Sequence, residues 1–229
     1  MCGRYEVHTP VEDVARAFDA RPTEEAAALP PRYNVAPSLR VPVVRESRKG
    51  RQLEAMTWGL VPSWAKDLAG AKPINARAET VFDKAMFRNA IIRRRCLVPA
   101  DGFYEWQAGP ARKQPFHVGM AGGELFAFGG IWEYWAAEGH EPLVSCAIIV
   151  TRPNELLSKI HNRMPVIVRP DDYSRWLDPG LADREAIEPM LEPFPAELMR
   201  AYPISTRVND VKNEGPELVA PVPAAAQTG

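Results

Sequence analysis

The second residue of the chain, Cys2, is a candidate for chemistry on an aldehyde. The sequence begins Met1-Cys2-Gly3, and a small residue at position 2 permits removal of Met1. Cys2 would then carry a free α-amine, with a reference pKa of about 7.7–8.0, beside a thiol with a reference pKa of about 8.5. The amine condenses with an aldehyde to a Schiff base, and the thiol can then close a five-membered thiazolidine ring. The alternative is an ordinary residue near a frayed terminus.

Glu105 is a candidate acid or base. The segment Gly102-Phe103-Tyr104-Glu105-Trp106 places one carboxylate among three aromatic residues. On a strand, Glu105 shares a face with Phe103 and opposes Tyr104 and Trp106. Such surroundings desolvate a carboxylate and raise its pKa toward a useful value. The alternative is a glutamate at a strand edge that faces water.

His161 is a second candidate acid or base, because histidine titrates near neutral pH. It lies in His161-Asn162-Arg163-Met164-Pro165, between an expected short helix and an expected strand. The other three histidines, His8, His117 and His140, are interpreted as structural or solvated.

Several residues suit contact with a nucleic acid. Arg4 follows Cys2 closely, and Asn75 and Arg77 project to the same face if their segment is extended. A guanidinium can bind a phosphate while an amide orients a neighbouring group. Trp64 lies on a Gly/Pro turn, where an indole can stack on a base or wedge between bases. Trp58, at a strand end, is expected in the core.

Other features favour structural roles. Arg93-Arg94-Arg95 is expected to end a helix, where cations suit the helix dipole. Cys96 and Cys146 lie in apolar runs and are expected to be buried and inert. The cysteines have neither CxxC spacing nor an accompanying histidine pair, so no zinc site is predicted, and no cofactor motif is found.

The composition limits the function classes. The chain has 229 residues, 46% of them hydrophobic, and a formal net charge of −1, which excludes a non-specific polycation. Its 23 prolines favour short elements and turns, and its three cysteines favour a reducing cytosol over a disulfide framework. No apolar run reaches the ~18 residues of a membrane span, and the N-terminus lacks the pattern of a signal peptide. We therefore expect a cytoplasmic protein.

The pattern of elements predicts an α+β fold, without the regular alternation of a parallel βαβ sheet. A helix is expected from Thr9 to Phe18, with Thr9 as its cap and Glu12 completing a capping box. Residues 20–32 are expected to form a loop. Further helices are expected over 79–92, 154–160, 171–177 and 183–191, and strands over 41–45, 53–58, 96–98, 102–107, 115–118, 125–128, 143–150 and 165–168.

Six motifs, taken together and in order, resemble the SOS-response-associated peptidase (SRAP) family of abasic-site sensors. They are Met-Cys-Gly-Arg-Tyr at the start, Pro-Arg-Tyr-Asn-Val-Ala-Pro at 31–37, Trp-Gly-Leu-Val-Pro-Ser-Trp at 58–64, Ile-Asn-Ala-Arg-Ala-Glu-Thr at 74–80, Gly-Phe-Tyr-Glu-Trp at 102–106 and His-Asn-Arg-Met-Pro at 161–165. The resemblance spans residues 2 to about 219, so one domain is expected over 1–219. Residues 220–229 are expected to be a disordered tail. The segment 208–216 departs from the family pattern after Asn209, which leaves its role open.

The resemblance implies a single α+β domain with an antiparallel, barrel-like β core, short flanking helices and a DNA-binding groove on one side. It implies that Cys2 crosslinks to the aldehyde of an abasic sugar in single-stranded DNA as a thiazolidine. Asn75, Glu105 and His161 match the family's other active-site positions. Arg4, Arg77 and Arg163 match its phosphate-contacting positions, and Trp64 falls in its DNA-wedging loop.

The mechanism expected from both lines of reasoning begins with attack of the Cys2 amine on the aldehyde. Glu105 would move protons, His161 would protonate the sugar oxygen, and Asn75 would orient the N-terminal residue or the sugar. The Schiff base would also allow strand-cleaving lyase activity, and self-cleavage would serve N-terminal maturation. The protein is expected to be a monomer, associated with the bacterial nucleoid at damage.

Two other functions remain open from the sequence. The first is an N-terminal-nucleophile amidohydrolase or peptidase, which uses a cysteine thiolate on an amide. No oxyanion hole or glutamine-binding loop can be located for it. The second is a non-covalent single-strand binder, in which the arginines and Trp64 would matter and Cys2 would not.

Overall fold

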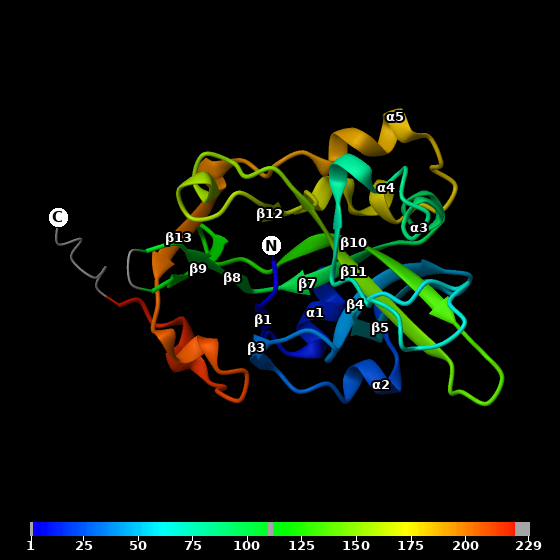
Figure 1. The fold of residues 1–229 in the computed structure, drawn as a ribbon, viewed down its shortest axis with the longest axis horizontal. Helices are drawn as coiled ribbons and strands as arrows, with labels where there is room; N and C mark the ends of the chain where they lie inside the picture. Colours follow the sequence, from blue (N-terminus) through cyan, green and yellow to red (C-terminus); the bar gives the residue numbers. More distant parts are fainter. Residues whose placement is uncertain (1, 110–111, 223–229) are drawn as a thin grey trace.

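Five strands close into a barrel at the centre of the computed structural model, which describes residues 2–109 and 112–222. They pair in the order β11-β10-β7-β4-β5, and β5 then pairs back onto β11 through Ser145↔Thr57 and Cys146↔Trp58. This closure satisfies backbone groups that would otherwise form open sheet edges. Figure 1 shows the barrel strands, which are β4 (Arg40–Ser47), β5 (Gly50–Trp58), β7 (Arg95–Ala100), β10 (Phe126–Trp135) and β11 (Leu143–Thr151).

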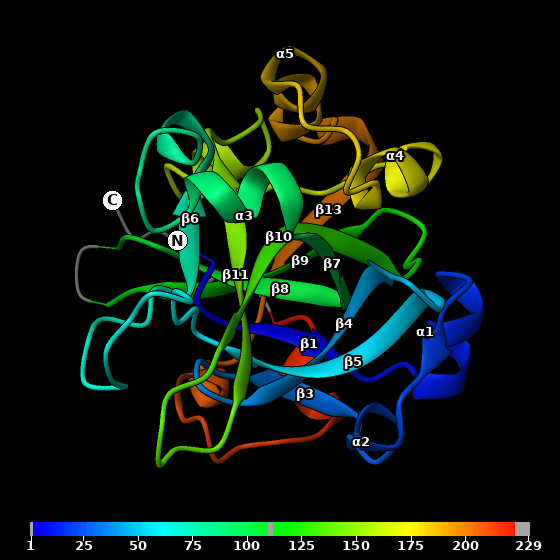
Figure 2. The same cartoon turned by 90° about the vertical axis from the view of Figure 1, so that its right-hand side faces the viewer.

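A second sheet leads out of the barrel, because only Asp101 separates β7 from the next strand, β8. Its order is β13-β9-β8-β1-β3, which places the first strand of the chain beside β8. Figure 2 shows this sheet running past the barrel. Its strands are β1 (Tyr5–Val7), β3 (Arg32–Val35), β8 (Gly102–Gln107), β9 (Gln114–Met120) and β13 (Met199–Pro203), while the short strands β2 (Arg21–Pro22), β6 (Asn75–Arg77) and β12 (Met164–Pro165) extend the barrel sheet.

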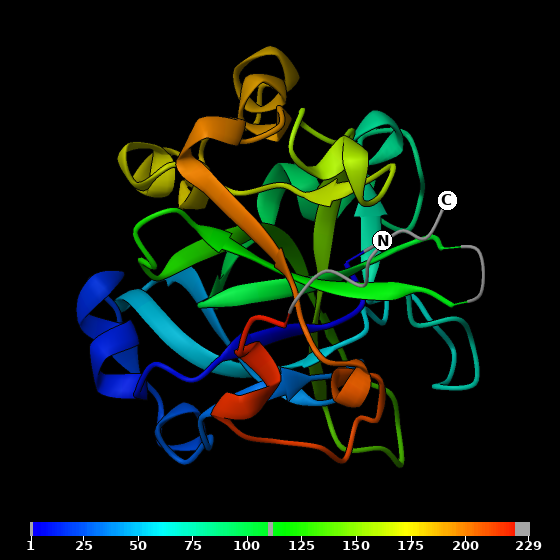
Figure 3. The ribbon, with the colours of Figure 1, turned by 90° about the vertical axis from the view of Figure 1, so that its left-hand side faces the viewer.

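The helices are short and lie around the two sheets (Figures 1 and 3). The α-helices are α1 (Val11–Ala17), α2 (Glu24–Ala27), α3 (Arg88–Arg93), α4 (Tyr173–Leu177) and α5 (Arg184–Ile187). The 3₁₀ helices are η1 (Ala78–Thr80), η2 (Leu157–Lys159), η3 (Pro170–Asp172), η4 (Glu188–Leu191), η5 (Ala196–Leu198), η6 (Thr206–Asn209) and η7 (Pro216–Val219). The predicted α+β class with a barrel-like core is confirmed. The barrel is antiparallel except at the β5–β11 pair that closes it.

Aromatic side chains join the second sheet to the barrel core. The ring of Tyr5 on β1 lies 5.2 Å from that of Trp58 and 5.6 Å from that of Phe128, edge to face in both cases. All three side chains are fully buried, as the sequence predicted for Trp58. Cys96 and Cys146 are also fully buried and free, as expected.

The start of the first helix differs from the prediction. Pro10, not Thr9, is the N-cap, and the expected capping box does not form. The Thr9 hydroxyl instead donates to Asp101 at 2.5 Å, and the same carboxylate accepts the backbone N–H groups of His8 and Thr9. A distant carboxylate therefore binds the Thr9 hydroxyl and N–H group that the predicted capping box would have used.

The helix predicted over 79–92 is wrong for most of its length, since only Arg88–Arg93 is α-helical. Tertiary contacts fix the segment before it. Val81 and Phe87 enter the core, Phe82 lies under the guanidinium of Arg184 at 4.9 Å, and Glu79 pairs with Arg163. These separate partners outweigh helix propensity, which is a weak preference.

Other boundaries also shifted. The loop predicted over 20–32 contains β2 and α2. The strand predicted over 125–128 continues through Gly129 and Gly130 to Trp135. A Cβ on Gly129 would lie 3.1–3.2 Å from side chains of Val166, Trp176 and Val168, so the missing side chain allows close packing there.

The C-terminal end of the described chain is paired with β13 and its continuation. The backbone N–H of Val222 donates to Pro203 at 2.9 Å, and Pro221 forms a bridge with Ile204. The rest of the predicted tail, 223–229, lies outside the described residues. No helix in the described part of the chain is long and apolar enough to cross a membrane.

Arg95, the first residue of β7, joins the end of α3 to the end of α4 and the loop that follows α4. Its buried guanidinium donates to the carbonyls of Ile91 and Ile92 at the end of α3, as expected for a cation at a helix C-terminus. It also donates to carbonyls of Trp176, Asp178 and Leu181. Burial lowers the pKa of Arg95 to about 10, so the group stays charged near neutral pH.

Replacement of Arg95 with Met should lower the free energy of unfolding by roughly 3 kcal/mol, because buried carbonyls would lose a charged donor. Urea unfolding measures the change. The matched control is Arg93→Met, at an exposed position two residues earlier, where a change within about 0.5 kcal/mol is expected. Equal effects of the two substitutions would contradict the structural role given to Arg95.

Candidate functional site

Cys2 and Asn75 are in direct contact. The side-chain amide of Asn75 donates to the backbone carbonyl of Cys2 at 2.9 Å. Asn75 begins β6, which pairs in parallel with β11 at Asn75↔Ile148, and Cys2 leads into β1 (Figure 2). The amide therefore anchors the start of the chain to the barrel.

Glu105 lies close to Cys2 on the neighbouring strand. β8 pairs with β1 at Tyr5↔Phe103, and the N–H of Tyr104 donates to the carbonyl of Arg4 at 3.0 Å. The Glu105 side chain is buried, as predicted, and does not face water at a strand edge. Phe103 enters the main core, whereas Tyr104 and Trp106 pack with Ile204 and Val208 on the other face.

Burial sets the protonation of this pair. Desolvation raises the pKa of the Glu105 carboxyl, against the opposing effect of the positive charge of His161. Burial, and then the charge of Glu105, raise the pKa of the Cys2 thiol far above its usual value. The thiol is consequently neutral here, and the nearby carboxylate binds a proton more readily than an exposed glutamate.

His161 completes the cluster, because it is near enough for its charge to act on Glu105. The backbone N–H of Arg163 donates to His161 Nδ1 at 3.1 Å. The Arg163 carbonyl lies 3.3 Å from the same nitrogen, so the backbone of Arg163 holds the ring in place whichever ring nitrogen carries the proton. Gln107 also donates to the carbonyl of Lys159 at 2.7 Å, which ties β8 to the His161 segment.

The other three histidines match their interpretation as structural or solvated residues. His117 is buried, with Nε2 2.7 Å from Glu6, and His8 is half-buried with Nδ1 3.4 Å from Glu6 and from Asp101. His140 is exposed.

Arg4, one of the predicted phosphate contacts, is buried, and its guanidinium is engaged by acceptors within the protein. Its Nε donates to Asn34 Oδ1 at 3.1 Å, and its Nη2 donates to the carbonyl of Val208. Asn34 donates in turn to the carbonyls of Asp210 and Asn213. The motif at 31–37 and the segment 208–216 thus form a clamp on the first strand (Figure 3). Phosphate binding by Arg4 stays a prediction.

Arg77 and Arg163 lie on either side of the end of β11. Val150 pairs with Arg77 in β6 and with Pro165 in β12, which follows Arg163 by two residues. Arg77 is exposed, and Arg163 forms an ion pair with Glu79. Sequence reasoning missed this role of Glu79, because only the fold brings η1 next to residue 163.

Trp64 is 61% exposed on the loop between Gly59 and Pro73. The ends of this loop are joined where Leu60 N–H donates to the carbonyl of Pro73 at 3.0 Å, beside Gly59 with its φ of 141°. Trp135 holds the middle of the loop, since its indole N–H donates to the carbonyl of Ala65 at 2.7 Å. Nothing in the sequence pointed to Trp135, which sits at the end of β10.

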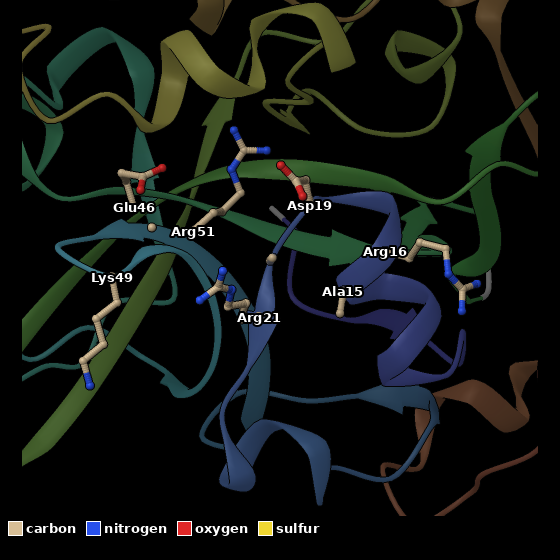
Figure 4. A pocket seen from close by; sticks show the side chains of 9 residues that line it. Ala15, Arg16, Asp19, Arg21, Glu46, Lys49 and Arg51 are labelled. Atoms are coloured by element: carbon tan, nitrogen blue, oxygen red, sulfur yellow. The ribbon is translucent and has the colours of Figure 1, made fainter.

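A pocket of about 490 Å³ lies elsewhere, between α1, β2 and the β4–β5 turn (Figure 4). Four cations, Arg16, Arg21, Lys49 and Arg51, share it with Asp19 and Glu46. None of the predicted site residues lines it. Within the described residues, no group of three or more His, Cys, Asp or Glu side chains could hold a metal ion.

Comparison with known proteins agrees with the motifs. The chain matches the family described as SOS response associated peptidase (SRAP) over residues 1–211. The abasic site processing protein YoqW of Bacillus subtilis (strain 168) is 40% identical over 221 residues, which cover 96% of this chain and 99% of that protein. The abasic site processing protein HMCES of Gallus gallus is 32% identical over 265 residues, covering 97% of this chain and 78% of that protein.

Solved structures show the same fold. A crystal structure of a protein from Bacteroides thetaiotaomicron has a TM-score of 0.86 and 28% identity, covering 96% of this chain and all of that one. A second, from Bordetella bronchiseptica, has a TM-score of 0.77 and 25% identity, covering 89% of this chain and all of that one. From its motifs, its fold and these relatives, the chain belongs to the SRAP family.

Proposed function

We propose that this protein captures abasic sites in single-stranded DNA by forming a covalent thiazolidine through Cys2, once Met1 has been removed. One observation carries the proposal: Cys2 is held by Asn75 beside Glu105 and His161, two groups that can exchange protons. The names of the relatives YoqW and HMCES, abasic site processing proteins, support the choice of lesion. All four residues come from one chain, so a monomer is sufficient.

The first step joins the protein to the sugar. His161 donates a proton to O4′, the ring oxygen of the abasic sugar, while the C1′ hydroxyl loses its proton to water, so that the C1′–O4′ bond breaks and the C1′ aldehyde forms. The Cys2 amine attacks C1′, and Glu105 accepts a proton from the amine. Loss of water from the resulting carbinolamine gives a Schiff base. Asn75, through its bond to the Cys2 carbonyl, keeps the amine in position.

The second step closes the ring. The Cys2 sulfur adds to C1′ of the Schiff base, the C=N bond becomes a single bond, and the thiol proton passes to the nitrogen. Overall, the aldehyde and the aminothiol give a thiazolidine and one water. A neutral thiol, which the raised pKa of Cys2 favours, supplies both the sulfur and this proton.

Two further activities are possible: cleavage of the DNA strand from the Schiff base, and removal of Met1 from the N-terminus. Before the ring closes, proton loss from C2′ of the Schiff base can break the C3′–O bond and cleave the strand, which is lyase chemistry. Ring closure removes the Schiff base and so suppresses this cleavage. Removal of Met1 by the protein itself would be a peptidase step that precedes both.

The expected DNA contacts surround this cluster. Arg77 and Arg163 would bind phosphates near the lesion, and Trp64 would stack on or separate bases. The protein would act on damaged DNA wherever single strands are exposed in the cell.

The amidohydrolase alternative uses the thiolate of Cys2 as its nucleophile. Burial and then the Glu105 carboxylate raise the pKa of the thiol, against the opposing effect of the positive charge of the N-terminus, so a resting thiolate is not favoured. The amine, whose reference pKa is about 7.7–8.0, is the better first nucleophile.

Replacement of Cys2 with Ser should abolish the stable crosslink but keep the Schiff base. The wild type is expected to give an adduct with abasic single-stranded DNA that survives a denaturing gel without reductant. Cys2→Ser should give an adduct only when borohydride reduces the imine, together with more strand cleavage, because no thiol closes the ring.

Two controls accompany this experiment. Cys96→Ala removes a different buried thiol and should still crosslink, and a chain that retains Met1 should not. A reductant-free adduct with Cys2→Ser, or none with the wild type lacking Met1, would overturn the proposal. Glutamine hydrolysis by the wild type would favour the amidohydrolase.

Replacement of Glu105 with Gln should slow crosslinking by roughly 10²-fold and remove part of its pH dependence. A raised pKa means that the wild-type carboxylate gains its base form only at a higher pH than usual, so the wild-type rate should rise with pH through that range. The variant should retain only the rise caused by the amine. Single-turnover rates from about pH 5 to 9 measure both profiles.

Stability gives an independent check on Glu105. A raised pKa stabilises the fold at low pH, and this contribution is lost as the pH rises through the raised value. Glu105→Gln should therefore be at least as stable as the wild type at neutral pH. Superimposable pH–rate profiles for the two proteins would rule out Glu105 as the base.

A further inference from the structure

Glu79 occupies the position between the two arginines expected to bind phosphate. β6 ends at Arg77 and continues into η1, which contains Glu79. Arg77 lies beside Val150 on one edge of β11, and β12 lies beside Val150 on the other. Glu79 thus faces Arg163 across the end of β11, with Arg77 near it.

The Glu79 carboxylate is charged in this setting. It forms an ion pair with Arg163 in which the side chains are 49% and 25% exposed, respectively. Partial burial works against ionisation of Glu79, but the Arg163 hydrogen bond, a backbone hydrogen bond and the charges of Arg163 and Arg77 together outweigh it, so the pKa of Glu79 is below its usual value. Near neutral pH Arg163 is therefore paired with an internal anion, and the charge of Arg77 also acts on it.

A carboxylate and a phosphate present similar acceptors to a guanidinium. We propose that Glu79 is an internal competitor of the DNA phosphate, which reduces the affinity of the Arg77–Arg163 pair for any single strand. This inference rests on the proposed function, since it takes DNA phosphate as the ligand of that pair. It makes Glu79 a specificity-determining residue that acts through Arg163.

The consequence is selectivity for the lesion. Phosphates are the same in damaged and intact strands, so phosphate contacts favour every sequence equally. A competing carboxylate weakens the phosphate contacts that all strands share, whereas the covalent bond of Cys2 forms only where an aldehyde is present. Intact strands would dissociate and abasic strands would be retained.

Glu79→Gln tests the inference, because glutamine keeps an acceptor for Arg163 but removes the charge. Binding to an intact, fluorescently labelled single strand is measured by anisotropy at several salt concentrations. The variant should bind roughly tenfold more tightly at low salt, and the slope of log K against log salt should steepen by up to about 0.7. A matched control is Glu25→Gln, in helix α2, which lies away from β6 (Figure 2). It removes a carboxylate from an exposed ion pair with Arg40 and should change neither the affinity nor the salt slope.

A double-mutant cycle shows whether the effect passes through Arg163. In an Arg163→Gln background, Glu79→Gln should give much less of its tenfold gain. A variant that binds no more tightly than the wild type, or a gain that persists in full without Arg163, would overturn the inference.

Adduct formation on abasic DNA, run in parallel, separates the two hypotheses. If the wild type forms the Cys2-dependent adduct and Glu79→Gln leaves binding of intact DNA unchanged, only the competitor role fails. If no such adduct forms, the proposed function fails.

Discussion

The site depends on the two edges of strand β11. On one edge, Ser145 and Cys146 pair with the end of β5, and Ile148 to Val150 then pair with β6. On the other edge, β10 pairs as far as Ile148, and β12 follows at Val150 and Thr151. One strand thereby fixes the start of the Trp64 loop, the Asn75–Arg77 segment and the His161–Arg163 segment. The strand that closes the barrel therefore also positions Asn75 and the segment that contains His161.

The cluster holds a carboxylate and a thiol that burial keeps from ionising easily. Groups of this kind can pass protons to one another directly during a reaction. Thiazolidine formation requires proton movements at nitrogen, oxygen and sulfur but leaves no net charge on the product. A buried, proton-exchanging site therefore matches aldehyde capture better than it matches attack by a thiolate.

Sequence reasoning succeeded where a local pattern decided the structure. Alternation along β8 predicted which face Phe103 and Tyr104 occupy, and turn residues separated the exposed Trp64 from the buried Trp58. The motifs named the residues that the fold brings together around Cys2. Long-range partners decided the rest. Most of the expected helix over 79–92 does not form, because Glu79 and Phe82 contact separate partners. Arg4 donates to Asn34 and Val208. Trp135 donates to the Trp64 loop from the end of a distant strand. No spacing in the sequence encodes those contacts.

The clamp on Arg4 also bears on the order of events during synthesis. Arg4 donates to a carbonyl 204 residues further along the chain, and Asn34 bonds to the same segment. The clamp cannot form until nearly the whole chain has left the ribosome, so the N-terminus is not fixed in its buried position before then. Removal of Met1 during synthesis would therefore act on an N-terminus that the clamp does not yet hold. The start of β1 would take its final position only when the 208–213 segment binds Arg4 and Asn34.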